Sequence, residues 1–127
     1  MDPWCQNTHG KSGLTQAVKD SKITLKDAEN QVLDFLKSLG LKSFTCPLAG
    51  NSVHQDKLFI QKDMPELYKF LHYRIVDVST IKECVKRWLP VEFKAPEKKL
   101  GHRALADILE SIAELKHYKD NIFMKVI

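Results

Sequence analysis

A histidine and an aspartate, His102 and Asp107, stand five residues apart near the end of the chain and could together carry proton-transfer chemistry. After His102, apolar residues recur at helical spacing and predict a helix over about residues 103–118: Leu105, Ile108, Leu109, Ile112 and Leu115. Five residues turn a helix by about 500°, which leaves the two side chains roughly 140° apart around the axis. They can therefore face one site only if His102 lies on the glycine-flanked loop before the helix and Asp107 on its first turns. Such a pair suits the removal of a proton from water at a metal site; a surface histidine and a solvated aspartate are the alternative.

A second candidate, Asp56, follows a short apolar stretch, residues 44–49, which we expect to form a buried strand. Ser52 and Gln55 have the spacing of a capping box and predict a helix from there to about Lys62. Asp56 then lies on the first turn of this helix, close to the carboxyl end of the strand, where ligands bind in open α/β sheets. It is well placed to be a metal ligand, although the helix dipole also favours an acidic residue at this position.

Other residues suggest contact with nucleic acid. Trp4 and His9 lie in a loop-like N-terminus, where a tryptophan could stack on a base and a histidine contact a phosphate; a frayed end is the simpler interpretation. The loop over residues 89–101 carries three lysines, Lys94, Lys98 and Lys99. They would be solvated by default, but they border the histidine and could attract a phosphate backbone. The formal net charge of +4 permits a polyanionic partner without implying one.

The composition is that of one globular domain with a single core, since 43% of the 127 residues are hydrophobic and 28% are charged. Cys5, Cys46 and Cys84 are odd in number and widely spaced. We therefore expect reduced thiols in an intracellular protein, and neither a disulfide framework nor a zinc site. No apolar run approaches membrane-spanning length, and the N-terminus lacks the features of a signal peptide or a transit segment.

Helices and short strands alternate along the chain. In addition to the elements above, we expect helices over residues 14–19, 25–39, 64–71 and 81–88, and a strand over residues 73–78. Capping-box spacing marks two of the helix starts, Thr24 with Asp27 and Thr80 with Glu83. Helix 25–39 should gather its apolar residues on one side, which would hold Leu25, Ala28, Val32, Phe35, Leu36 and Leu39. Leu58 and Phe59 should point inward from the helix that Ser52 opens. This alternation predicts an α/β fold with parallel strand pairing.

Four segments of the chain resemble the motifs of one enzyme family. In order, they are residues 4–14 (Trp4, then Thr8-His9-Gly10-Lys11-Ser12-Gly13-Leu14), 50–56 (Gly-Asn-Ser-Val-His-Gln-Asp), 72–80 (His-Tyr-Arg-Ile-Val-Asp-Val-Ser-Thr) and 102–107 (His-Arg-Ala-Leu-Ala-Asp). In these segments the chain resembles the oligoribonucleases, which belong to the DEDDh branch of the 3′-to-5′ exonucleases and have the ribonuclease H-like fold. The resemblance covers essentially all 127 residues. It implies a single exonuclease domain over residues 1–127, made of the C-terminal part of that fold, with few parallel strands flanked by helices.

The resemblance also implies an activity, the two-metal hydrolysis of very short RNA such as dinucleotides, with Mg²⁺ or Mn²⁺ held by carboxylates. Asp56 and Asp107 match two of the family's metal ligands, and His102 matches the general base that deprotonates the attacking water. The other matches concern the substrate: Trp4 packs on the bases, His9, Ser52 and Ser79 surround the terminal 5′ phosphate, and Tyr73 and Arg74 complete that site across a homodimer. The family works in mitochondria and in the cytoplasm.

The chain departs from the family at the first motif, an Asp-x-Glu pair on the first strand, which does not occur before Trp4. We therefore expect the chain to begin at an internal methionine and the domain to be incomplete at its N-terminus. With two of the four acidic residues, the isolated chain should hydrolyse RNA negligibly. A non-catalytic fragment that binds oligonucleotides or dimerises is the alternative function. Ala106 is a smaller departure, at a position where relatives often carry an acidic residue, and we expect little effect from it.

Overall fold

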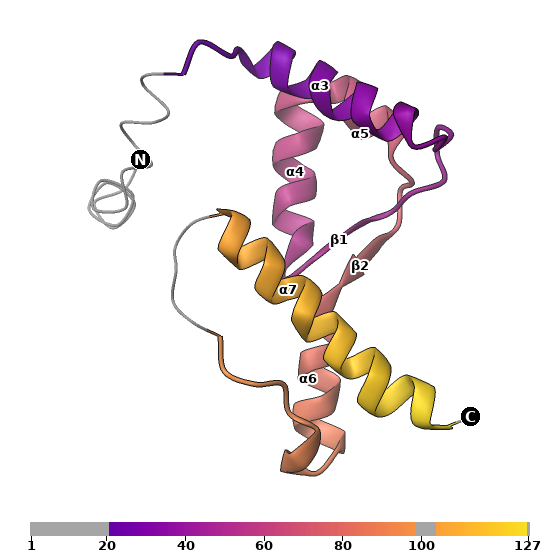
Figure 1. The fold of residues 1–127 in the computed structure, drawn as a ribbon, viewed down its shortest axis with the longest axis vertical. Coiled ribbons are helices and arrows are strands. Elements are labelled where there is room, and N and C mark those ends of the chain that lie inside the picture. The colour runs from indigo at the N-terminus through magenta and orange to yellow at the C-terminus, as the bar shows by residue number, and fades with distance from the viewer. Residues whose placement is uncertain (1–20, 99–103, 127) are drawn as a thin grey trace.

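A computed structural model describes residues 21–98 and 104–126, in which two short parallel strands are surrounded by helices (Figure 1). The elements are α3 (Leu25–Ser38), β1 (Leu48–Gly50), α4 (Val53–Asp63), α5 (Pro65–Phe70), β2 (Ile75–Asp77), α6 (Val78–Trp88), the 3₁₀ turn η1 (Val91–Phe93), α7 (Ala104–Tyr118), the π-helical turn η2 (Lys119–Phe123) and the 3₁₀ turn η3 (Met124–Val126). The helix expected over residues 14–19 lies outside the described residues.

The parallel pairing of β1 with β2 confirms the α/β prediction. Leu48 pairs with Ile75 and Gly50 with Asp77, so the two strands end side by side. Both strands pass almost directly into a helix, β1 into α4 and β2 into α6. The loops and side chains that follow the strands therefore converge at one edge of the small sheet.

The first strand begins later than the sequence predicted, at Leu48 and not at residue 44. Phe44 has a φ of 67°, in the left-handed region, and its N–H donates to the carbonyl of Phe70 at 2.7 Å. Pro47 has no N–H to donate to a neighbouring strand. The backbone thus reaches an extended, paired conformation only after the proline.

Of the three capping boxes predicted from the sequence, only the one at Thr24 is formed. The Thr24 hydroxyl accepts from the Asp27 N–H at 3.0 Å, and the Asp27 carboxylate accepts from the Thr24 N–H at 3.3 Å. Ser52 makes no cap hydrogen bond, because it has a left-handed conformation (φ 52°). The prediction that Thr80 caps a helix beginning at Ile81 was also wrong, since α6 begins at Val78 and Asp77 caps it by accepting from the Ser79 N–H.

The core consists of two small apolar clusters. The first joins α3 and α5 and is built from Leu33, Leu67 and Phe70, with Leu36, Ile60, Met64 and Leu71 packed around them. The second joins α6 and α7 and is built from Val78, Val85 and Tyr118, with Ile81, Phe93, Ala95, Leu115 and Ile122 packed around them. Figure 1 shows α3 and α5 together near one end of α4, and α6 and α7 toward the opposite end of α4.

The buried faces of two helices differ from those that the apolar pattern predicted. In α3, Phe35 is 62% exposed, whereas Glu29 and Leu33 are buried. In α4, Leu58 and Phe59 are 63% and 68% exposed, and Val53 is the buried residue. The helix over residues 103–118 is confirmed as α7, although its four apolar residues before Leu115 are more than half exposed.

Glu29 explains why α3 turns this face inward. The residue is 1% exposed, and its carboxylate accepts from the backbone N–H groups of Glu66 (2.9 Å) and Leu67 (3.1 Å), in the first turn of α5. The Lys26 Nζ atom lies 3.0 Å from the Glu29 Oε1 atom. Burial opposes ionisation of Glu29, but these hydrogen bonds and Lys26 outweigh it and hold the pKa of the carboxyl below its ordinary value. A negative charge also suits the positive end of a helix dipole.

We expect Glu29→Gln to lower the thermal midpoint of the chain by several degrees at neutral pH. A carboxyl whose pKa is lowered by folding stabilises the fold above its unfolded pKa, near 4.5, and loses that contribution as the pH falls through the folded pKa. The difference between wild type and variant should therefore shrink in acid, measured by circular dichroism at pH 7 and about pH 3.

Glu66→Gln is the matched control, because the Glu66 side chain is 54% exposed and pairs only loosely with Lys69, at 3.6 Å. It should change the thermal midpoint little. Equal midpoints for wild type and Glu29→Gln at neutral pH would contradict the role given to Glu29.

Candidate functional site

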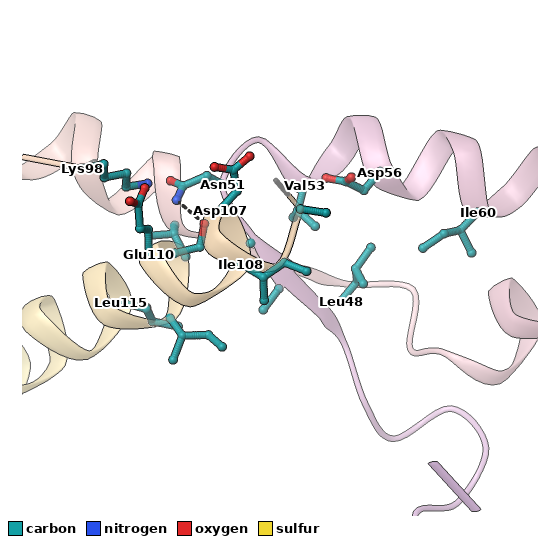
Figure 2. Close-up of a pocket in the computed structure, with 16 residues that line it drawn as sticks. Leu48, Asn51, Val53, Asp56, Ile60, Lys98, Asp107, Ile108, Glu110 and Leu115 are labelled. Atoms are coloured by element: carbon teal, nitrogen blue, oxygen red, sulfur yellow. Dashed lines mark hydrogen bonds between the residues drawn. The ribbon is translucent and has the colours of Figure 1, made fainter. Parts of the chain in front are cut away.

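A cavity of about 670 Å³ opens at the carboxyl end of β1, lined by residues of β1, α4 and α7. Much of its lining is apolar, from Leu48, Val53, Ile60, Val78, Ile108 and Leu115. Asp56 and Asp107 also line it, one from the first turn of α4 and the other from the first turn of α7 (Figure 2). The structure thus brings together the two carboxylates that the sequence analysis singled out as metal ligands.

Two buried valines hold the helices that carry this site. Val53 opens α4 and is 2% exposed, and Val78 opens α6 and is 1% exposed. Residues three apart lie on the same side of a helix, so Asp56 is placed on the same side as Val53, at the edge of the cavity. The paired strands therefore determine where the carboxylate of Asp56 lies.

Asp56 and Asp107 offer the hard carboxylate oxygens that Mg²⁺ and Mn²⁺ prefer. Within residues 21–98 and 104–126, no group of three or more His, Cys, Asp and Glu side chains could hold a metal ion. The two carboxylates therefore fit part of a divalent-metal site, and a complete site needs further ligands.

Ser52 and Ser79, expected beside a terminal phosphate, lie next to each other at the N-termini of α4 and α6. Their hydroxyl oxygens are 3.4 Å apart, and the Ser52 N–H donates to the Ser79 oxygen at 3.1 Å. The Asp77 Oδ1 atom accepts from the backbone N–H groups of both serines, at 2.9 and 3.0 Å. His54 Nδ1 lies 3.7 Å from Asp77 Oδ2. Asp77 thus already takes a hydrogen bond from each of these two backbone N–H groups, and the two hydroxyls lie beside them.

Tyr73 and Arg74 lie at the other end of β2 from Ser79. The Tyr73 ring stacks on His72, with centroids 4.5 Å apart, and Arg74 Cζ lies 5.4 Å from the centroid of the Tyr73 ring. Phe44, whose centroid is 5.9 Å from that of Tyr73, adds a further ring. Within one chain, the structure does not bring Tyr73 and Arg74 to the two serines.

Three of the predicted site residues, Trp4, His9 and His102, lie outside the described residues. Lys98 is exposed, as expected, but its Nζ atom also lies 2.6 Å from the buried carboxylate of Glu114, a contact that the sequence did not predict.

Sequence reasoning missed three residues that contact this region: Asn51, Asp77 and Glu114. Asp77 could have been predicted from the sequence, because aspartate is a common helix cap and Asp77 lies near the end of the expected strand, before the next helix. Glu114 is seven residues after Asp107 and so shares its helix face, but nothing local marks it as buried.

The remaining composition-based expectations concern thiols and membranes. Cys46 and Cys84 are free and partly buried, and Cys5 is outside the described part of the chain. Among the helices that the structure describes, none is both long enough and apolar enough to span a membrane.

Comparison with known proteins connects these residues to a family. A family model described as an exonuclease matches residues 1–115. The chain is 56% identical to a human protein named "Oligoribonuclease, mitochondrial" over 128 aligned residues, which cover 100% of the chain and 54% of the relative. It is 54% identical to an oligoribonuclease of Aromatoleum aromaticum, and the alignment covers 100% of the chain and 68% of that protein. It is 52% identical to a probable oligoribonuclease of Caenorhabditis elegans, and that alignment covers 98% of the chain and 64% of the relative. The chain thus spans about half the length of the mitochondrial relatives it matches.

Proposed function

The chain belongs to the oligoribonuclease family of exonucleases, and on that premise we propose that it serves the 3′-to-5′ hydrolysis of very short RNA to mononucleotides. The observation that carries the proposal is the meeting of Asp56 and Asp107 at one cavity, although they are far apart in the sequence. Both lie in motifs that matched the family, and both offer the oxygen ligands that such chemistry uses.

The exonuclease family generally uses divalent metal ions. We assign Asp56 and Asp107 as ligands of Mg²⁺ or Mn²⁺. Bound ions would neutralise charge on the scissile phosphate and stabilise the attacking and leaving oxygens. The two carboxylates would hold the ions in place, and His102 would take the proton from the attacking water.

The remaining matched residues would bind the substrate. Ser52, Ser79 and His9 would surround a 5′ phosphate, and Trp4 would pack on a base. Tyr73 and Arg74 would reach the same phosphate from the partner in a homodimer, which accounts for their position at the far end of β2. A closed phosphate site would favour dinucleotides, since a longer strand has nowhere to continue.

The names of relatives bear on the compartment and on the alternative function. The human, mouse and bovine relatives are named mitochondrial, and bacterial relatives carry the same enzyme name. We propose that this chain also works inside the cell, in mitochondria, in the cytoplasm or in both. A non-catalytic binding fragment is not favoured, because the relatives reported above are named as oligoribonucleases or probable oligoribonucleases.

The proposal is tested with a fused protein, in which the chain follows an N-terminal segment of the human oligoribonuclease that contains the family's Asp-x-Glu motif. The fused protein should convert a labelled diribonucleotide to mononucleotides in Mn²⁺. The chain alone should do so negligibly, because two carboxylates leave the ions poorly neutralised and poorly held.

Two controls make this result specific. The human segment alone should be inactive, and EDTA should stop the fused protein. A well-folded fused protein that leaves the diribonucleotide intact would contradict the proposal, and so would equal turnover by the human segment alone.

A further inference from the structure

Glu114 is a buried carboxylate that sits behind the cavity, on α7. The residue is 4% exposed, and its oxygens contact Lys98 Nζ (2.6 Å), the Tyr118 hydroxyl (2.8 Å) and the Asn51 side-chain amide (3.3 Å). Burial opposes ionisation, but these three hydrogen bonds outweigh it and hold the pKa of Glu114 below its usual range. Burial and Glu114 raise the pKa of Tyr118 well above its ordinary value, so the phenol keeps its proton and donates. Glu114 is therefore an ionised group that can only accept hydrogen bonds.

This acceptor determines the orientation of Asn51. A carboxamide has a donating nitrogen and an accepting oxygen, and only the nitrogen can face a carboxylate. The Asn51 nitrogen accordingly donates to Glu114 and also to the Ser111 hydroxyl, at 2.8 Å. The Asn51 oxygen must then point the other way, where it accepts from the Ser79 hydroxyl at 3.0 Å.

The orientation of Asn51 in turn determines which group receives the proton of the Ser79 hydroxyl. A serine hydroxyl has one proton, and that of Ser79 is donated to Asn51. Toward Ser52 the Ser79 oxygen therefore offers only lone pairs, and it accepts from the Ser52 N–H at 3.1 Å. The Ser52 hydroxyl lies 3.4 Å from the same Ser79 oxygen, and both backbone N–H groups donate to Asp77.

We propose that Glu114 is a positioning residue for the phosphate subsite, acting through Asn51 to hold the Ser79 hydroxyl in place beside Ser52. This rests on the proposed function for the identity of the ligand, but the hydrogen-bond chain itself exists in the free protein. Lys98 supplies the charge that lets Glu114 remain ionised while buried.

The free chain gives the first test, by ¹H–¹⁵N NMR of side-chain amides. The Asn51 amide protons should exchange with solvent at least about tenfold more slowly than those of Asn30, which is exposed. Glu114→Gln should remove most of this difference in exchange rate. The neutral glutamine amide can turn either its oxygen or its NH2 group toward Asn51, so the Asn51 amide is no longer held in one orientation. Ser111→Ala is the matched control: it removes the other acceptor of the same amide but leaves the charge, and Asn51 should stay protected. Fast exchange of the Asn51 amide in the wild type would overturn the proposal, even if Glu114→Gln fails to fold.

The second test compares binding of a 5′-phosphorylated and a 5′-hydroxyl diribonucleotide to the fused protein, in Ca²⁺ to prevent turnover. Ser52→Ala should reduce the preference for the phosphorylated ligand about tenfold, as expected for a hydrogen bond to a charged group. Ser79→Ala should act in the same direction, and Glu114→Gln should reduce the preference by about threefold, because Glu114 acts through Asn51 and Ser79. An unchanged preference in a folded Glu114→Gln variant would overturn the positioning role of Glu114.

The two tests separate this inference from the proposed function. A wild type with no preference for the 5′ phosphate refutes the phosphate subsite, and with it the assignment of Ser52. The exchange of the Asn51 amide then still shows whether Glu114 orients the chain of hydrogen bonds.

Discussion

Replacing Asp107 with asparagine in the fused protein is expected to lower kcat for diribonucleotide hydrolysis by more than about 100-fold. Removing a residue that merely hydrogen-bonds to a metal ligand costs up to about 100-fold, and loss of a ligand itself should cost more. The substitution keeps the size and shape of the side chain but removes one of the carboxylate charges that line the cavity. Asp107 is exposed, so the core should be unaffected. Asp56→Asn should act in the same direction, and both variants should need more Mn²⁺ for half-maximal activity.

Asp63→Asn is the matched control for these variants. Asp63 ends α4, whereas Asp56 lies on its first turn, and it is exposed and does not line the cavity. Its kcat and Mn²⁺ requirement should equal those of the wild type. If Asp56→Asn and Asp107→Asn behaved like Asp63→Asn, the cavity would not be the metal site.

Helix and strand positions were largely predictable from local patterns, but helix starts depended on tertiary partners. Thr24 caps α3 as expected because all the groups in that capping box are within four residues of one another. Ser52 has the same local spacing, yet its backbone N–H is drawn to Asp77 and Ser79, which follow the neighbouring strand. No local pattern could reveal these contacts, because they exist only once β1 and β2 pair.

The inward faces of the helices were the least predictable feature. An apolar pattern assumes that charged residues face solvent. Glu29 contradicts this in α3, because the N-terminus of α5 provides hydrogen bonds that compensate for burial. Glu114 contradicts it in α7, because Lys98 and Tyr118 do the same. Both carboxylates are buried against partners from other segments of the chain, so neither could be found from periodicity.

The candidate site was predicted as separate motifs, and the structure places only some of the predicted residues near one another. Asp56 and Asp107 line one cavity, and Ser52 lies beside Ser79, as the motifs implied. The residues that hold these groups in place, Asn51 and Glu114, carry no catalytic chemistry of their own and had no motif role. Motifs mark the groups that touch substrate, whereas the supporting hydrogen bonds emerge only from the packing of α7 against β1.

His102→Ala in the fused protein is expected to lower kcat by about 10²- to 10⁴-fold, the usual contribution of a general base, with little change in KM. The assignment comes from the motif, since His102 lies outside the described residues, and steady-state kinetics on the diribonucleotide test it. Added imidazole should restore part of the activity, because a small base can enter the space that the side chain leaves.

Imidazole rescue distinguishes the two large effects expected at this site. A base that is lost can be replaced from solution, whereas the charge lost in Asp107→Asn holds metal ions and cannot be replaced by a neutral base. Imidazole should therefore rescue His102→Ala and leave Asp107→Asn inactive. Near-normal turnover by His102→Ala without imidazole would show that another group takes the proton. Rescue of both variants would show that imidazole acts elsewhere and that neither role has been correctly assigned.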